Sequence, residues 1–89
     1  MPQKTVKTKL RKPSRKMMQI LADNMREFRR KQGISQEELA EMCNLHRTYV
    51  GSVERGERNV TLSTLEAIAA ALSIGVSKLL TERGIEKDG

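Results

Sequence analysis

Aromatic residues and cysteine are scarce in this sequence, and long apolar runs are absent. Its 89 residues include no tryptophan, one tyrosine and one phenylalanine, so any core has to be built from aliphatic side chains, which suits packed helices. The single cysteine excludes an internal disulfide, and a chain without disulfides fits a reducing compartment. No apolar run approaches the roughly 18 residues of a membrane-spanning helix, and the stretch 17–22 is too short for the apolar region of a secretory signal. We therefore expect no membrane partner.

The residue sets that support catalysis or metal binding are missing as well. His46 is the only histidine, and together with Cys43 it supplies two of the four ligands that a structural zinc site normally needs. Neither a Ser-His-Asp set nor a glycine-rich phosphate loop can be argued from the sequence. We therefore expect a protein that is not an enzyme, holds no metal or cofactor and has no small-molecule substrate.

Positive charge is plentiful but unevenly placed. The net charge is +6, and residues 1–16 contain seven lysines and arginines and no acid. The rest of the chain holds the other ten of the 17 bases and all 11 acids, a net charge of −1. We expect residues 1–16 to form a disordered basic arm, which serves either as a phosphate-binding extension or as a solubilising tail. Sequence-specific binding would then depend on local patches of the near-neutral body.

Residues 17–82 carry helical patterns and helix-end signals, and residues 83–89 are expected to form a frayed tail. Apolar residues spaced at i, i+4 and i+7 indicate a first helix that stops at Gly33. Ser35 and Glu38 have the spacing of a capping box. Five helices are expected, over about residues 15–32, 36–43, 47–55, 62–72 and 77–82. With no credible strand, the sequence predicts an all-α domain.

The second and third expected helices are joined by three residues, which is the spacing of a helix-turn-helix. The third helix begins with polar residues, and Ser52 follows Thr48 by one turn, so the outward stripe combines an arginine with hydroxyl groups. Such a stripe fits the donors and acceptors of a DNA major groove, where arginine can bind guanine through two hydrogen bonds. We expect base contacts from Arg47, Thr48, Ser52 and, in the loop that follows, Arg58.

Contacts to the DNA backbone are expected from residues around this stripe. The start of the second helix can hold a phosphate through its amides and the Gln36 side chain. Tyr49 either packs its ring on the body or offers its hydroxyl to a phosphate, and Arg55 either binds phosphate or pairs with a nearby acid. The expected backbone contacts are Gln36, Tyr49, Arg55 and Asn59.

Several spaced segments together resemble the lambda-repressor-like, or Xre-type, helix-turn-helix family. They include Gly-Ile-Ser-Gln-Glu-Glu-Leu-Ala (33–40), Val-Glu-Arg-Gly (53–56) and Leu-x-x-Ile-Ala-x-x-Leu (65–72), and the resemblance covers about residues 18–82. Within this family, Arg-Thr-Tyr (47–49) and the segment 54–62 are most similar to the controller proteins of restriction–modification systems. Those proteins are small dimers that bind operators upstream of their own gene and the endonuclease gene.

The resemblance implies five helices with the third in the major groove, and dimerisation through the last helix. It also implies an ion pair between Glu54 and Arg29. Three features depart from the controllers. His46 stands where they usually have an aspartate cap, so we expect a less firmly capped third helix. Gly51 and Ser52 replace a Ser-Gly or Ser-Lys pair, and the basic arm is longer than usual.

A short apolar stripe near the C-terminus suggests self-association. Part of it has to close the small core, and the remainder would form a self-complementary patch of the kind that makes a twofold dimer. The stripe consists of Ile74, Val76, Leu79, Leu80 and Ile85, and the first four are the expected dimer contacts.

The sequence therefore predicts a homodimer that binds a palindromic operator in double-stranded DNA and regulates transcription. Two recognition helices would enter successive major grooves about 34–36 Å apart. We favour a restriction–modification controller in the bacterial cytoplasm, associated with the nucleoid. A phage-type or host repressor is a close alternative, and an antitoxin that neutralises a partner protein is another. An RNA-binding or coactivator-like domain is disfavoured, because binding to single strands usually relies on aromatic platforms.

Overall fold

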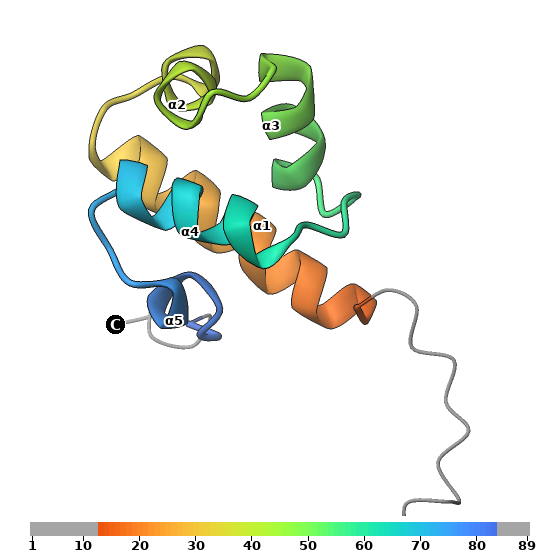
Figure 1. Cartoon of the computed structure of the whole chain (residues 1–89). Coiled ribbons are helices and arrows are strands. Elements are labelled where there is room, and N and C mark those ends of the chain that lie inside the picture. The colour runs from red at the N-terminus through yellow and green to blue at the C-terminus, as the bar shows by residue number, and fades with distance from the viewer. Residues whose placement is uncertain (1–12, 84–89) are drawn as a thin grey trace, which may run out of the picture.

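Five helices lie within residues 13–83, which are the residues that this computed structural model describes (Figure 1). They are α1 (Arg15–Lys31), α2 (Gln36–Cys43), α3 (Arg47–Glu54), α4 (Leu62–Ala71) and α5 (Val76–Leu79). No strand occurs within these residues, so the all-α fold class expected from the sequence is confirmed.

The first helix begins at Arg15, as expected from the sequence, and includes the last two residues, 15 and 16, of the expected basic arm. Ser14 is its N-cap, and the serine hydroxyl accepts a hydrogen bond from the amide three residues on at 3.1 Å. Such a cap fixes the start of a helix, so Arg15 and Lys16 are helical, and the division between arm and domain at residue 16 stays a prediction. Residues 1–12 of that arm and 84–89 of the expected tail lie outside the described part of the chain.

Local signals set the ends of α2 and α3. Both hydrogen bonds of the capping box are present: the Glu38 amide donates to the Ser35 hydroxyl at 2.9 Å, and the Ser35 amide donates to the Glu38 carboxylate at 2.8 Å. Asn44 ends α2 with a φ of 58°, a left-handed conformation that asparagine tolerates. His46 then caps α3, because its Nδ1 accepts the Thr48 amide at 3.1 Å. The turn between the two helices is therefore fixed by the backbone conformation of Asn44 and the side chain of His46.

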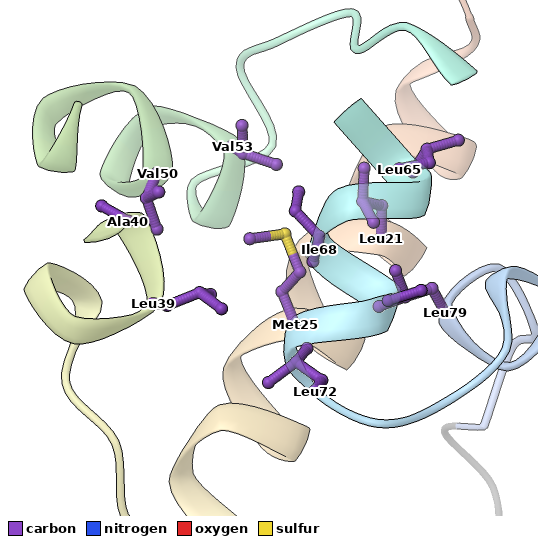
Figure 2. Close-up of a cluster of buried hydrophobic side chains, with 11 residues drawn as sticks. Leu21, Met25, Leu39, Ala40, Val50, Val53, Leu65, Ile68, Leu72 and Leu79 are labelled. Atoms are coloured by element: carbon purple, nitrogen blue, oxygen red, sulfur yellow. The ribbon is translucent and has the colours of Figure 1, made fainter. Parts of the chain in front are cut away.

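The core lies where α1 and α4 meet the other helices. The α2–α3 pair packs on one side of α1 and α4, and the short α5 packs against both on the opposite side (Figure 1). Aliphatic side chains from all five helices converge between them (Figure 2). The largest fully buried apolar residues are Met25, Leu39, Ile68, Leu72, Leu79, Val50 and Val53.

A buried asparagine of α1 holds the last helix. The Asn24 side chain is 3% exposed, and its amide nitrogen lies 2.8 Å from the carbonyl oxygens of both Leu79 and Thr81. The Lys78 carbonyl is 3.5 Å away. A helix end leaves its last carbonyls without partners inside the helix, so Asn24 satisfies groups that the four-residue α5 cannot satisfy itself.

We expect Asn24→Ala to lower the free energy of unfolding by about 1–3 kcal/mol, because buried carbonyls lose their donor. Urea denaturation of the variant measures this loss. The neighbouring Asp23→Ala is a matched control, since the Asp23 side chain is 56% exposed and its ion pair with Arg26 is a surface contact. Equal losses in the two variants would contradict the capping role of Asn24.

Candidate nucleic-acid interface

Buried side chains fix the orientation of helix α3 about its own axis. Val50 and Val53 on its inner side are 0% and 1% exposed and lie within the core (Figure 2). The first residues of the helix, Arg47 and Thr48, are exposed. Burial of the valines on the inner side therefore leaves the start of α3 at the surface, where DNA contacts are expected from the sequence.

A buried carboxylate ties α3 to α1 and α2. Glu54 is 2% exposed. Its two oxygens accept hydrogen bonds from Arg29, at 2.7 Å from Nε and 3.0 Å from Nη2. Arg29 also donates from Nη1 to the Ile34 carbonyl at 2.9 Å, and Arg26 donates from Nη1 to the Glu54 carbonyl. The ion pair that the family resemblance implies is confirmed, and it joins the end of α3 to α1 and, through Arg29, to the loop before α2.

Gln36, an expected phosphate contact, belongs to the same network. It is exposed at the first position of α2, and its Nε2 donates to Glu54 Oε1 at 2.9 Å. A side-chain amide has two hydrogens and one oxygen, so this bond fixes which way the amide points and engages one hydrogen. Gln36 therefore bridges the start of α2 to the end of α3 while its side chain remains at the surface.

The outward position expected for Ser52 is wrong. Ser52 is 4% exposed, and its hydroxyl is engaged twice within the molecule. It donates to the Tyr49 carbonyl oxygen at 2.7 Å and accepts from Arg58 Nε at 2.8 Å. The spacing of residues along a helix placed Ser52 outward, but the loop after α3 folds back over it. The Glu57 amide donates to the Ser52 carbonyl oxygen at 3.0 Å.

Arg58 is instead exposed and lies against α3. Gly56 makes the necessary reversal of the chain with a φ of 75°, a left-handed conformation that glycine adopts without a steric cost. The guanidinium carbon of Arg58 then lies 5.3 Å from the centroid of the Tyr49 ring, within cation–π range. Tyr49 is half-buried, so its ring serves as packing surface for Arg58.

Arg55 lies just after the helix and pairs with an acid, one of the two alternatives open in the sequence. Its Nε is 3.1 Å and its Nη2 is 3.3 Å from the two carboxylate oxygens of Glu57. Both side chains are more than half exposed. Gly51 leaves room beside this pair, because a Cβ there would lie 3.4 Å from Arg55 Nη1 and 3.6 Å from Gln36 Oε1. Sequence reasoning missed both Glu57 and this space.

We expect Gly51→Ala to raise the free energy of unfolding by about 0.5–1 kcal/mol, because glycine inside a helix is less favourable than alanine by that amount. The atoms nearest the new methyl group are the far ends of the flexible Arg55 and Gln36 side chains, which can move aside. Thermal denaturation measures the change. A loss of stability would show that these side chains resist displacement.

Charge around the start of α3 has both signs. An open hollow of about 370 Å³ is lined by Arg47 and His46 together with Glu37 and Glu41 of α2. Next to this hollow, exposed arginines lie at the start of α3 (Arg47) and in the loop after it (Arg58), where Asn59 is also exposed. Glu37 and Glu38 in the first turn of α2 and Glu41 in its second are acidic and would repel phosphate, so a phosphate contact from this helix is confined to its first residue, Gln36.

The expected dimer contacts fall into two groups. Leu79 is 0% exposed, so its assignment to a dimer interface is wrong: in this thin core it is needed to cover α1 and α4. Ile74, Val76 and Leu80 are partly buried and pack against the core. Leu80 also lines an apolar groove of about 190 Å³ with Met17 and other residues.

Residues 13–83 contain no group of three or more histidine, cysteine or acidic side chains that could hold a metal ion. Cys43 packs against the core, and its Sγ donates to the Ala67 carbonyl oxygen at 3.6 Å. Burial raises the pKa of the Cys43 thiol, which disfavours the reactive thiolate. Among the helices of this part of the chain, none has the length and apolar composition needed to cross a bilayer.

Comparisons with known proteins agree with this geometry. The sequence profile of the family described as Helix-turn-helix matches residues 25–79. The control protein C.SmaI of Serratia marcescens is 57% identical over 70 residues, which cover 79% of this chain and 83% of that protein. The crystal structure of the hypothetical transcription factor NHTF from Neisseria superposes with a TM-score of 0.76 at 44% identity, covering 85% of this chain and 88% of that one.

A third relative is a restriction–modification controller of known structure. C.AhdI from Aeromonas hydrophila superposes with a TM-score of 0.68 at 44% identity, and the match covers 70% of this chain and 94% of that one. Sequence and structure therefore agree on the fold, on the helix-turn-helix formed by α2 and α3, and on the kind of protein that carries it. The chain belongs to the Xre-type helix-turn-helix family of DNA-binding transcriptional regulators.

Proposed function

We propose that this chain is a restriction–modification controller protein that binds a palindromic operator in duplex DNA as a homodimer. The observation that supports the proposal is that the orientation of α3 about its own axis is fixed. Its inner side is held by buried valines and by Glu54, and its exposed start presents Arg47 and Thr48. A short helix fixed in this way can enter a major groove with its first residues facing the base edges.

The contacts divide by position. Arg47 and Thr48 at the start of α3, and Arg58 in the loop, contact bases. Arginine has the fork that matches guanine O6 and N7, and threonine can accept or donate. The residues that contact the backbone are Gln36, Tyr49, Arg55 and Asn59. Arg55 exchanges the Glu57 carboxylate for a phosphate, which a surface ion pair permits because it contributes little stability.

The twofold partner is a second copy of the chain. A palindromic site requires two recognition helices related by a twofold axis, with half-sites one helical turn apart. The partly exposed Leu80 and its apolar neighbours near α5 offer the surface through which two copies associate. The protein works on the nucleoid in the cytoplasm of a bacterium, where it regulates transcription from the operator that it binds.

Selection of binding sites from a random duplex pool, at near-physiological salt, tests the proposal. We expect enrichment of an inverted repeat with half-sites about one helical turn apart, and a match to that repeat upstream of the protein's own gene. A variant with both Arg47→Ala and Thr48→Ala is the control and is expected to enrich no motif. Salt-sensitive binding to all duplexes without enrichment by the wild-type protein would contradict the proposal.

A further inference from the structure

Three side-chain groups meet where the loop after α3 returns to the helix. They are the Ser52 hydroxyl, the Tyr49 ring and the Arg58 guanidinium. The hydroxyl is buried, and it links the Tyr49 carbonyl oxygen at 2.7 Å to Arg58 Nε at 2.8 Å. The guanidinium carbon lies 5.3 Å from the ring centroid. Each contact alone is ordinary, but the Ser52 hydroxyl and the Tyr49 ring together hold the Arg58 side chain from two directions.

We propose that Ser52 and Tyr49 are positioning residues that hold the Arg58 guanidinium against α3, so that Arg58 reaches DNA from a preset place. The inference rests on the proposed function, because it assigns Arg58 to the same DNA surface. It changes the role of Ser52 from a base contact to a support for one. In this arrangement, α3 and the loop after it contact the bases together.

The geometry of the guanidinium determines which atoms remain for DNA. Arginine has five N–H donors in a planar fork, and its Nε donor is directed at Ser52. The guanidinium can therefore approach a base or a phosphate only through its terminal Nη1 and Nη2 edge. That edge can form the paired hydrogen bonds that guanine O6 and N7 accept.

Preorganisation explains why such a support would raise affinity. A free arginine side chain loses rotamer freedom when it binds, and each immobilised side chain of this kind lowers affinity roughly two- to tenfold. Arg58 has already lost that freedom in the free protein, because Ser52 fixes its Nε and Tyr49 covers one face. Its binding to DNA then requires little further ordering.

We expect Ser52→Ala to leave the fold intact, because alanine favours helix more than serine does. The variant should bind the selected operator about three- to tenfold more weakly than wild type, from the loss of preorganisation. Binding to scrambled duplex should change less. Ser77→Ala, at an exposed serine of α5, is the matched control and should leave both affinities unchanged.

A double-mutant cycle separates a positioning role from an independent contact. In the Arg58→Ala background, Ser52→Ala should cause no further loss of operator affinity, because there is no guanidinium left to position. Additive losses would overturn the inference, since they would mean that Ser52 acts on DNA by itself. Tyr49→Phe keeps the ring but loses the hydroxyl proposed to contact the backbone, so it should lower the affinities for operator and scrambled duplex alike and keep their ratio. Tyr49→Leu removes the cation–π contact and should lower that ratio.

A measurement without DNA distinguishes failure of this inference from failure of the proposed function. In nuclear magnetic resonance spectra of the free protein, the Arg58 Nε–H signal should exchange slowly with water in wild type and rapidly in Ser52→Ala. Equally rapid exchange in both proteins would overturn the inference, whatever the operator. If the signal is protected but the wild-type protein selects no operator, the proposed function fails and the positioning contact stands.

Discussion

Replacing Arg47 with alanine is expected to weaken operator binding by at least about 30-fold. A two-bond contact from arginine to a base contributes about 1–3 kcal/mol of discrimination, and a dimer makes it twice. Arg47 is exposed at the first position of α3, whose inner side is fixed in the core. Fluorescence anisotropy with the selected operator and with a scrambled duplex measures both affinities, and the loss should be much smaller on the scrambled one.

Two further variants sharpen this test. Arg47→Lys keeps the charge but lacks the planar fork, so we expect it to retain scrambled-duplex binding and to lose most of the operator preference. Arg30→Ala removes an exposed arginine from α1 and controls for the loss of one positive charge. If Arg47→Ala weakened binding to both duplexes equally, Arg47 would be a phosphate contact and its base-reading role would be refuted.

The second large effect concerns stability. We expect Glu54→Ala to lower the free energy of unfolding by about 3–5 kcal/mol, because it leaves the charge of Arg29 buried without its partner. The two side chains are 2% and 11% exposed, so water cannot replace the lost carboxylate. A domain of this size has only about 5–15 kcal/mol in total, so the variant should unfold at much lower urea concentrations.

Glu57→Ala provides the comparison for this prediction. It also removes a carboxylate from an arginine, but the Arg55 and Glu57 side chains are 60% and 55% exposed. Exposed ion pairs contribute little, so we expect a change below about 0.5 kcal/mol. Should Glu54→Ala cost no more than Glu57→Ala, the buried pair would not be what holds α3 against α1 and α2.

The helix-turn-helix itself could be predicted because its signals are local. The capping box of Ser35 and Glu38 and the left-handed turn at Asn44 are read from residues three or four apart, and both are present. The pairing of Glu54 with Arg29 spans 25 residues, and only resemblance to a family implied it. Short-range patterns thus gave the elements, while family resemblance supplied the contact that joins them.

Predictions failed where other parts of the chain cover a helix. Spacing along α3 placed Ser52 outward, but Gly56 turns the chain back and brings Arg58 onto that serine. Spacing near α5 likewise suggested a surface role for Leu79, which the thin core takes up completely. Asn24 gave no signal in the sequence, because the carbonyls that it caps are more than 50 residues away.

Two α3 helices are proposed to read the major groove of a palindromic site. Methylation interference on the selected operator tests it most directly, since a methyl group on guanine N7 projects into the major groove and one on adenine N3 into the minor groove. We expect that N7 methylation of guanines in both half-sites blocks binding, whereas N3 methylation of adenines within the half-sites does not. Binding that tolerates every N7 methyl group, or is blocked only by N3 methyl groups, would contradict it.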